Sequence, residues 1–393
     1  MTGAAVPADG CVEWLGAPSG GGSLAGLRLA VKDNIEIAGA RFTAGHPAFA
    51  ERRGTDTAPA VRALVDAGAA LVAMGATDAG GFGVTGAGVD NPVHPRRIVG
   101  GSSGGCAALL AAGRADLALG TDTGGSVRIP AACTGLWAYK PEHGAIPVAG
   151  VFPLAPRFDT VGLVARSAAV LRKAVDVSVP GEARRDTKKI TRLGIFCGPG
   201  WQRDRATDRL FARIRAIVRQ LGIETVPLNF PDRAEVVRCH ATQVLTQAAE
   251  VYSSVARDER RCLAAAAIKA LRAAEKLSAQ EIGAASAAGR RILEEVEKAD
   301  ATVDLVLGPT LAILPPRRDT PGIYGAERIA ALTGETCLAN LSGRAALCGP
   351  VGCLGLQVLA IGSQREGFTA TSIRLLRDIR ALASGAPGCG NPN

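Results

Sequence analysis

The stretch GTDTGGS occupies residues 120–126 and follows a short apolar run at residues 116–119. Residues 127–132, VRIPAA, come next and can begin a helix. A serine at a strand-to-helix turn lies among backbone N–H groups that have no partner inside the helix. These groups and the helix dipole attract negative charge, so the turn can present a nucleophile and stabilise the oxyanion that its attack creates. The stretch therefore predicts a nucleophilic serine, Ser126, in an α/β fold.

A base must accompany that serine, because a hydroxyl with an ordinary pKa is a poor nucleophile. The usual base is histidine, and this chain has four that lie in no familiar catalytic motif: His46, His94, His143 and His240. Lys32 follows an apolar segment, residues 27–31, that is typical of a buried strand. Burial can lower the pKa of a lysine enough to give a neutral fraction near pH 7. A second glycine-serine turn, GGSSGG at residues 100–105, precedes another apolar run. These features favour a serine hydrolase with a lysine base.

The first part of the chain has the pattern of a parallel sheet. We expect strands at residues 27–31, 69–74 and 116–120, with helices at 57–67 and 106–112 between them. Strand–helix–strand units of this kind build parallel sheets.

The remaining sequence predicts further strands and Ala-rich helices, after a loosely held lead-in. The lead-in covers residues 1–26, and a proline-rich loop with short extended pieces is expected at 145–165; strands are expected at 192–197, 303–307 and 354–362, and helices at 207–221, 235–256, 260–298 and 369–383.

Length and composition allow one large domain. The chain has 393 residues, is 47% hydrophobic and contains 49 glycines, which is ample for a core and excludes a disordered chain. The composition turns polar at residues 178–191. We therefore expect a single domain over 1–393, with a catalytic core at 24–178 and a covering half, lining the substrate pocket, at 190–393.

Charge and cysteine content argue against several function classes. The net charge is +9, but the basic residues are scattered, and no run of five or more of them occurs. We therefore expect no binding of nucleic acid. No Cys-x-x-Cys occurs among the ten cysteines, so no metal site, cofactor or disulfide framework is expected. The sequence shows no secretion signal and no run of 18 apolar residues, which predicts a cytoplasmic protein without a membrane span.

In several stretches the sequence resembles the amidase signature family. The stretches that carry the resemblance are AVKDNI at residues 30–35, GGSSGG at 100–105, LGTDTGGSVRIPAA at 119–132, KP at 140–141, DTVG at 159–162 and ANLSG at 339–343. They occur in family order, and the central one is long and specific. The resemblance implies a central mixed β-sheet covered by helices on both faces.

The resemblance also implies a role for each residue of a Lys–Ser–Ser triad. Lys32 takes the place of the base, Ser102 that of the bridging serine and Ser126 that of the nucleophile. The 24-residue spacing from Ser102 to Ser126 equals the family's and favours Ser102 over its neighbour as the bridge. In the family a cis peptide bond precedes the bridging serine, here after Gly101. The backbone N–H groups that would hold the oxyanion belong to Thr123, Gly124, Gly125 and Ser126.

The implied activity is hydrolysis of a small carboxamide through an acyl-enzyme, with release of ammonia or an amine. Two alternatives stay open: an amidotransferase subunit that works with a partner protein, and a catalytically silent scaffold member of the family. Arg128 is a weak candidate for binding a substrate carboxylate, and a structural ion pair with Asp122 is the preferred interpretation. The expected partner is a small-molecule amide, and a homodimer stays open. Departures from the common pattern include Asp78, where the family usually has asparagine.

Overall fold

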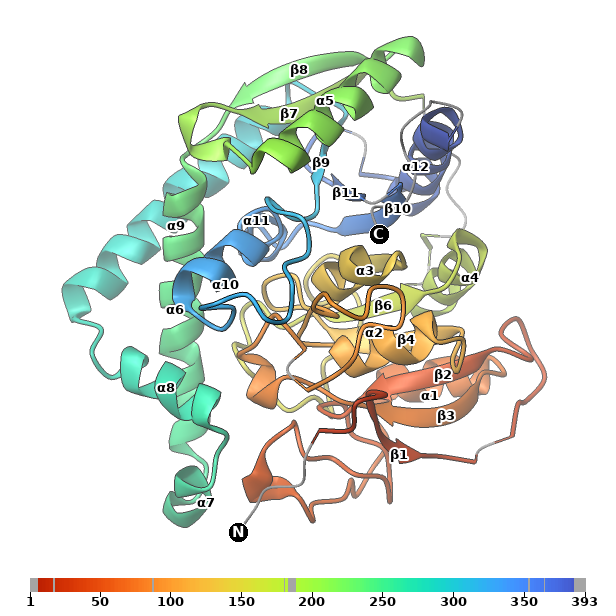
Figure 1. Ribbon diagram of the computed structural model, residues 1–393, viewed down its shortest axis with the longest axis vertical. Coiled ribbons are helices and arrows are strands. Elements are labelled where there is room, and N and C mark those ends of the chain that lie inside the picture. The colour runs from red at the N-terminus through yellow and green to blue at the C-terminus, as the bar shows by residue number, and fades with distance from the viewer. Residues whose placement is uncertain are drawn as a thin grey trace.

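One mixed sheet of eleven strands runs through the molecule (Figure 1). The computed structural model describes residues 6–384 except 17, 87, 180, 183–188, 353 and 364. The strands are β1 Cys11–Trp14, β2 Arg28–Lys32, β3 Ala70–Gly75, β4 Leu117–Thr121, β5 Trp137–Lys140, β6 Val161–Ala165, β7 Arg192–Cys197, β8 Glu224–Asn229, β9 Leu305–Pro309, β10 Ala346–Val351 and β11 Leu354–Leu359. Their order in the sheet is β1-β3-β2-β4-β6-β5-β10-β11-β9-β7-β8.

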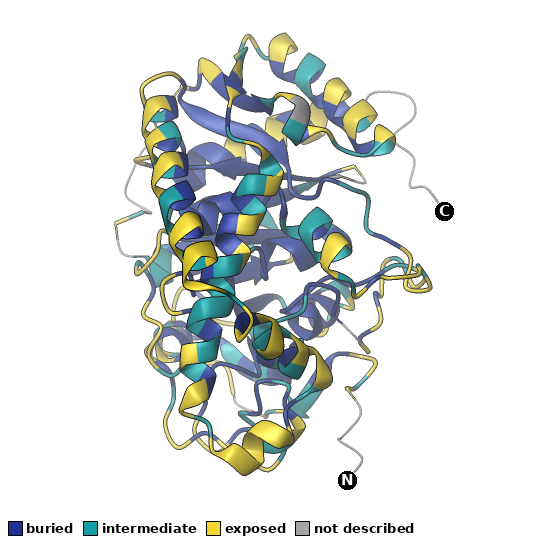
Figure 2. Ribbon diagram, turned by 90° about the vertical axis from the view of Figure 1, so that its left-hand side faces the viewer, coloured by how far each residue is buried: buried dark blue, intermediate teal, exposed yellow. Residues whose placement is uncertain are grey.

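Helices cover both faces of the sheet, as the sequence predicted. They are α1 Pro59–Asp66, α2 Gly104–Ala111, α3 Arg128–Thr134, α4 Ala168–Ser178, α5 Arg205–Gln220, α6 Arg233–Ser253, α7 Arg257–Arg261, α8 Ala265–Ala274, α9 Ala279–Asp300, α10 Ala326–Thr333, α11 Cys337–Leu341 and α12 Phe368–Ser384. The long helices α6 and α9 lie side by side along one edge of the molecule (Figure 1). Seen from that edge, their outer faces are exposed and the strands behind them are buried (Figure 2).

The two faces of the sheet contribute to different core clusters, because successive side chains of a strand point to opposite sides. Leu29 and Val31 of β2 pack in one large cluster together with residues of α1, α4, α5 and α12. Ala30, between them, packs in another cluster together with residues of α2 and α3. The sheet is therefore buried on both faces.

Small residues let α2 lie very close to the sheet. A Cβ atom on Gly75 of β3 would lie 2.7 Å from Sγ of Cys106, and one on Gly105 would lie 2.2 Å from the backbone nitrogen of Ala76. Neither position could hold a larger residue without a shift of the backbone. The abundance of glycine and alanine thus serves a close approach between the helix and the strand ends beneath it.

The topology brings the predicted functional segments to one edge of the sheet. β2 pairs in parallel with β4, so Lys32 at the end of β2 and Thr121 at the end of β4 lie at the same carboxyl edge. The turns that precede α2 and α3 carry Ser102 and Ser126. In α/β sheets, ligands bind outside the carboxyl ends of the strands.

Most of the expected elements are confirmed, and the expectation of a loose lead-in is wrong in part. The strand at 192–197 coincides with β7, and β2, β3, β4 and β11 begin within a residue of where they were expected. The lead-in at 1–26 is not wholly loose, because β1 pairs there with β3. The Ala-rich stretch at 260–298 is helical as expected and is divided among the end of α7, α8 and α9. The expected boundary at 178–191 lies partly outside the described residues.

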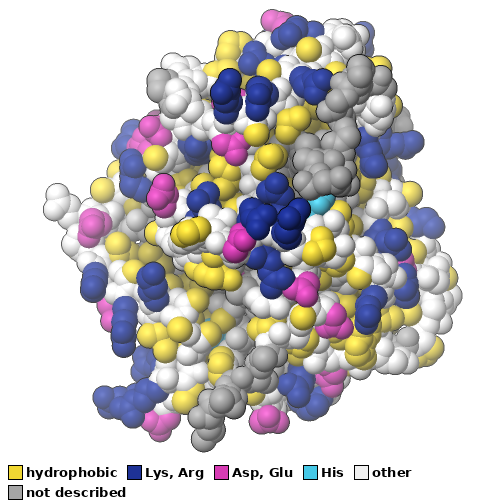
Figure 3. Space-filling model, in the orientation of Figure 1, with side chains coloured by type: hydrophobic (Ala, Val, Ile, Leu, Met, Phe, Trp, Pro, Cys, Tyr) yellow, Lys and Arg dark blue, Asp and Glu magenta, His cyan; other side chains and the backbone are white. Residues whose placement is uncertain are grey.

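The face of the molecule shown in Figure 3 carries both basic and acidic side chains. On the face shown in Figure 3, Lys and Arg side chains are spread from top to bottom, with Asp and Glu side chains among them. No helix in the part of the chain that the structure describes is long and apolar enough to cross a bilayer.

Candidate active site

The three predicted catalytic residues lie at one buried site. Lys32 is fully buried, and Ser102 and Ser126 are 1% and 6% exposed. The Nζ atom of Lys32 lies 2.8 Å from Oγ of Ser102 and 2.7 Å from Oγ1 of Thr121. The backbone N–H of Ser103 donates to the carbonyl of Ser126 at 3.1 Å, which holds the two serine turns side by side. The contact with Lys32 belongs to Ser102 and not to its neighbour, as the sequence spacing favoured.

Burial changes the protonation of Lys32. Its removal from water lowers the pKa of Lys32 from 10.5 to about 8, and nearby acidic groups limit the fall. A lysine with a pKa of about 8 is neutral in roughly a tenth of the molecules at pH 7. Lys32 can therefore accept a proton at neutral pH, whereas an exposed lysine is almost always charged.

The turn before Ser102 is packed on all sides. The peptide bond between Gly101 and Ser102 is cis, as the resemblance implied. A Cβ atom on Gly101 would lie 1.9 Å from Oδ2 of Asp78, so only glycine fits there. Asp78, which departs from the common pattern, accepts a hydrogen bond from the N–H of Gly86 at 3.0 Å, and its own N–H donates to the carbonyl of Ser102 at 3.1 Å. This packing determines where the Ser102 hydroxyl lies.

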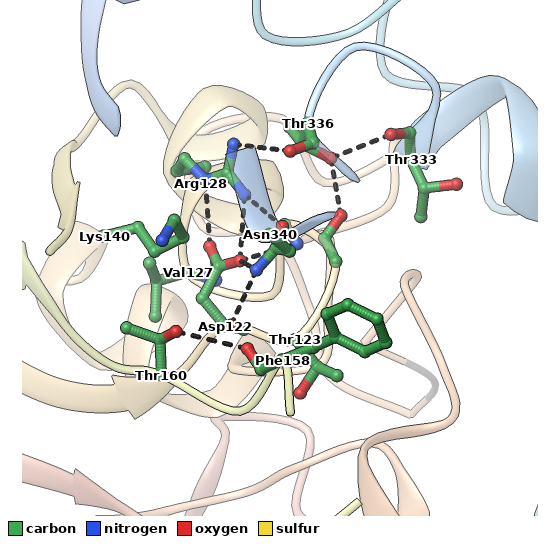
Figure 4. Close-up of polar contacts among 12 residues, drawn as sticks. Asp122, Thr123, Val127, Arg128, Lys140, Phe158, Thr160, Thr333, Thr336 and Asn340 are labelled. Atoms are coloured by element: carbon green, nitrogen blue, oxygen red, sulfur yellow. Dashed lines mark hydrogen bonds and ion pairs between the residues drawn. The ribbon is translucent and has the colours of Figure 1, made fainter. Parts of the chain in front are cut away.

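A buried ion pair braces the turn that carries Ser126 (Figure 4). The Nε and Nη2 atoms of Arg128 lie 3.0 and 2.9 Å from the two carboxylate oxygens of Asp122, and neither side chain is exposed. Nη2 also donates to Oδ1 of Asn340 at 2.8 Å. Burial alone would raise the pKa of Asp122, but the charge and hydrogen bonds of Arg128 hold it below its usual value. Arg128 thus forms the structural ion pair that the sequence analysis preferred to carboxylate binding.

The N–H groups of the turn differ in what they contact. The Gly125 N–H donates to Oδ1 of Asp122 at 2.7 Å. The N–H groups of Thr123, Gly124 and Ser126 have no hydrogen-bond partner among the described residues. Three of the four predicted oxyanion donors are therefore free to bind, and the fourth is held by the carboxylate next to it.

Side chains from the covering half hold the carbonyl groups of the same turn. His240 of α6 places Nε2 at 2.8 Å from the carbonyl oxygen of Thr123. Thr336, just before α11, donates from Oγ1 to the carbonyl of Gly124 at 2.6 Å. The sequence analysis assigned neither residue a role, because each comes from a segment without a recognisable motif. Asp159, which lies in a matching stretch, accepts from Oγ1 of Thr123 at 2.6 Å.

A second buried lysine lies near the ion pair of Arg128 and Asp122. Lys140 ends β5, is fully buried and donates from Nζ to the carbonyl of Pro141 at 2.7 Å. Burial, together with the charge of Arg128, lowers the pKa of Lys140 from 10.5 to about 7. Of these two buried lysines, Lys32 is the one that contacts a serine hydroxyl.

Among the described residues, no group of three or more His, Cys, Asp or Glu side chains is placed to hold a metal ion. The site itself holds a buried lysine in contact with a serine hydroxyl, and a second serine turn whose N–H groups are in part without a partner among the described residues. These are the parts that acyl transfer needs: a base, a nucleophile and oxyanion donors.

Comparison with known proteins shows which family this chain resembles. The model of the Amidase family matches residues 9–368. A glutamyl-tRNA(Gln) amidotransferase subunit from Thermus thermophilus is 31% identical over 401 residues, covering 87% of this chain and 82% of the relative. Amidase 1 of Arabidopsis thaliana is 39% identical, but the match covers 38% of this chain and only 37% of that protein. A solved crystal structure of an amidase, 28% identical, superimposes with a TM-score of 0.80 over 91% of this chain and 85% of that one.

The chain therefore belongs to the amidase family, marked by the amidase signature. Its family and its structural neighbours make it an enzyme that hydrolyses amides.

Proposed function

We propose that this enzyme hydrolyses a small carboxamide through an acyl-enzyme on Ser126, with Lys32 and Ser102 as a proton relay. The observation that carries the proposal is the 2.8 Å contact between Nζ of Lys32 and Oγ of Ser102 in a fully buried setting. A lysine that burial has made partly neutral, in contact with a serine hydroxyl, is an activated base.

The relay moves protons in a balanced sequence. Neutral Lys32 takes the proton of Ser102, which takes the proton of Ser126. Oγ of Ser126 then bonds to the amide carbon, and the carbonyl electron pair moves to the oxygen. When the C–N bond breaks, Ser102 gives one proton to the nitrogen, which leaves as ammonia or an amine, and Lys32 returns its proton to Ser102. Water then attacks the acyl-enzyme along the same route, releasing a carboxylic acid and restoring Ser126.

The oxyanion would be held by the N–H groups of Thr123, Gly124 and Ser126, which have no partner among the described residues. The Gly125 N–H would not bind the oxyanion in the same way, because it already donates to Asp122. Removing one oxyanion donor typically lowers kcat by about 10²- to 10³-fold. The geometry of this turn is thus expected to matter as much as the serine itself.

A second candidate activity is that of an amidotransferase component working with a partner protein. It is supported by the relative in Thermus thermophilus, which bears the name of such a component and matches most of this chain. The purified chain alone is expected to release ammonia from simple amides if the first candidate is right. Ammonia release that appears only with a co-purified partner would favour the second.

Intact-mass measurement after treatment with a fluorophosphonate tests the nucleophile. Oγ of Ser126 would bond to phosphorus, fluoride would leave, and the proton would pass to the relay. We expect one adduct per chain, mapped to Ser126, and none in Ser126→Ala. A wild-type protein that stays unmodified, or an adduct that maps elsewhere, would refute the assignment of Ser126 as the nucleophile.

The pH dependence of kcat/KM tests the base. Because only neutral Lys32 can accept a proton, kcat/KM is expected to rise about tenfold per pH unit below pH 8 and to level off above it. The second buried lysine supplies the control, since Lys140→Met removes the other group that titrates in this range. If the inflection disappears in Lys140→Met while activity persists, the titrating group is Lys140, and Lys32 is not the base that sets the pH dependence.

A further inference from the structure

His240 reaches from the covering half into the turn that carries the proposed nucleophile. It lies on α6, more than a hundred residues beyond Ser126, and is 8% exposed. Its Nε2 atom is 2.8 Å from the carbonyl oxygen of Thr123. A carbonyl can only accept, so Nε2 carries the hydrogen. Burial, with a smaller effect of the Arg128 charge, lowers the pKa of His240 to about 4, so at neutral pH the ring is the neutral tautomer protonated at Nε2.

The carbonyl that His240 holds shares a peptide unit with the N–H of Gly124. This peptide is trans, and in a trans unit the C=O and N–H point in opposite directions. Holding the Thr123 carbonyl toward α6 therefore directs the Gly124 N–H away from α6. Glycine has no Cβ to restrict its backbone, so this direction must be imposed from outside.

The next peptide unit in the turn provides an internal comparison. Its carbonyl, that of Gly124, accepts from Thr336 at 2.6 Å, and its N–H, that of Gly125, donates to Asp122 at 2.7 Å. That unit is held at both ends. The unit between Thr123 and Gly124 is held at the carbonyl alone, and its N–H has no partner among the described residues.

Resting on the function proposed above, we propose that His240 is a positioning residue that aims the Gly124 N–H at the oxyanion. Its hydrogen bond to the Thr123 carbonyl sets the direction of this one donor and leaves the donor free for substrate. His240 acts through the peptide and does not touch the reacting atoms.

Close packing around the His240 ring holds its hydrogen bond to the Thr123 carbonyl in place. A Cβ atom on Gly124 would lie 2.9 Å from Cε1 of His240, so the ring lies directly against the turn. The ring of Phe158 packs against the His240 ring, with ring centroids 5.1 Å apart. The neighbouring Cys239 bonds through Sγ to the carbonyl of Ala285 on α9 at 3.1 Å, which fixes α6 against the next helix.

Two variants of matched size separate the hydrogen bond from the packing. His240→Leu keeps an apolar side chain of similar size but has no donor, whereas His240→Gln offers an amide nitrogen at about the reach of Nε2. For amide hydrolysis we expect His240→Leu to lower kcat by roughly 10- to 100-fold, less than the loss of a whole oxyanion donor. We expect KM to change by less than about threefold, and His240→Gln to recover most of kcat.

The rate of fluorophosphonate labelling at Ser126 supplies a second readout, because its phosphoryl oxygen would occupy the oxyanion position. Labelling is expected to slow in His240→Leu and recover in His240→Gln, while the pH inflection near 8 stays in place. Should His240→Leu not fold, His240→Asn replaces it, since its shorter amide cannot reach the carbonyl.

The outcomes distinguish this inference from the function on which it rests. A wild-type protein that forms no adduct at Ser126 refutes the proposed function. A reactive wild type with equal kcat and labelling rate in His240→Leu refutes the positioning role alone. A loss in His240→Leu that His240→Gln does not restore also refutes it, because the packing and not the hydrogen bond would then be responsible.

Discussion

Replacing Lys32 by methionine is expected to lower kcat by at least about 10³-fold, because the variant keeps the side-chain length but has no base. The loss should not reflect unfolding. The charged form of Lys32 is disfavoured in the folded protein, since burial lowers its pKa from 10.5 to about 8. Circular dichroism and thermal unfolding measured beside kcat would show a folded, inactive protein. Activity within tenfold of wild type at neutral pH would contradict the role of Lys32 as the base.

The same substitution has a stability effect whose sign follows from the pKa. Between pH 8 and 10.5 the unfolded chain holds a proton on Lys32 that the folded chain has lost, so wild-type stability rises with pH in this window. Below pH 8 the full penalty, roughly 3 kcal/mol, applies to wild type and is absent from Lys32→Met. As pH rises from 7 to 10, the free energy of unfolding of wild type should therefore increase relative to that of Lys32→Met. A difference independent of pH would mean that Lys32 titrates normally.

Replacing Arg128 by methionine is expected to have the second large effect, on stability. Asp122 is fully buried, and the substitution would remove the guanidinium that pairs with its carboxylate. Removing one partner of a buried ion pair typically costs about 3–5 kcal/mol. Activity should fall as well, because Asp122 holds the N–H of Gly125 in the turn that carries Ser126. Urea unfolding followed by circular dichroism measures the change in stability.

Arg291 offers a matched control for this experiment. It pairs with Glu235 at 2.7 Å, but its side chain is 61% exposed and that of its partner 32% exposed. Exposed pairs contribute about 1 kcal/mol or less, so Arg291→Met should cost far less than Arg128→Met. Equal costs for the two substitutions would show that the buried pair does not brace the turn.

The catalytic segments could be predicted from the sequence because their signals are local. Lys32 and Ser126 lie next to short apolar runs, and each run is an interior strand of the sheet. The family resemblance added Ser102, the cis peptide bond before it and the order of the stretches. A strand, a turn and a helix start within a dozen residues leave a pattern that can be recognised without knowing the fold.

The residues that hold the turn from outside could not be predicted in the same way. His240 and Thr336 act through contacts with Thr123 and Gly124, which lie 117 and 212 residues away in the chain. Nothing in the Ala-rich sequence of α6 indicates which of its side chains faces that turn. Such contacts depend on how the covering half packs on the catalytic core, which is a tertiary property.

One helix boundary that the prediction left out could have been found in the sequence. Residues 278–281, SAQE, form a capping box at the start of α9, in which the Ser278 side chain accepts from the N–H of Glu281. A serine followed three residues later by glutamate marks a helix start. The break between α8 and α9 was thus present in the sequence, but the high alanine content of the whole stretch obscured it.

The relay itself is tested most directly by a double-mutant cycle on the rate of fluorophosphonate labelling at Ser126. Lys32→Met, Ser102→Ala and the double variant are each compared with wild type at pH 8. If both side chains act in one proton path, each single variant slows labelling strongly and the double variant is no slower than the worse of the two. Effects that multiply in the double variant would show that Lys32 and Ser102 act independently, which contradicts the relay.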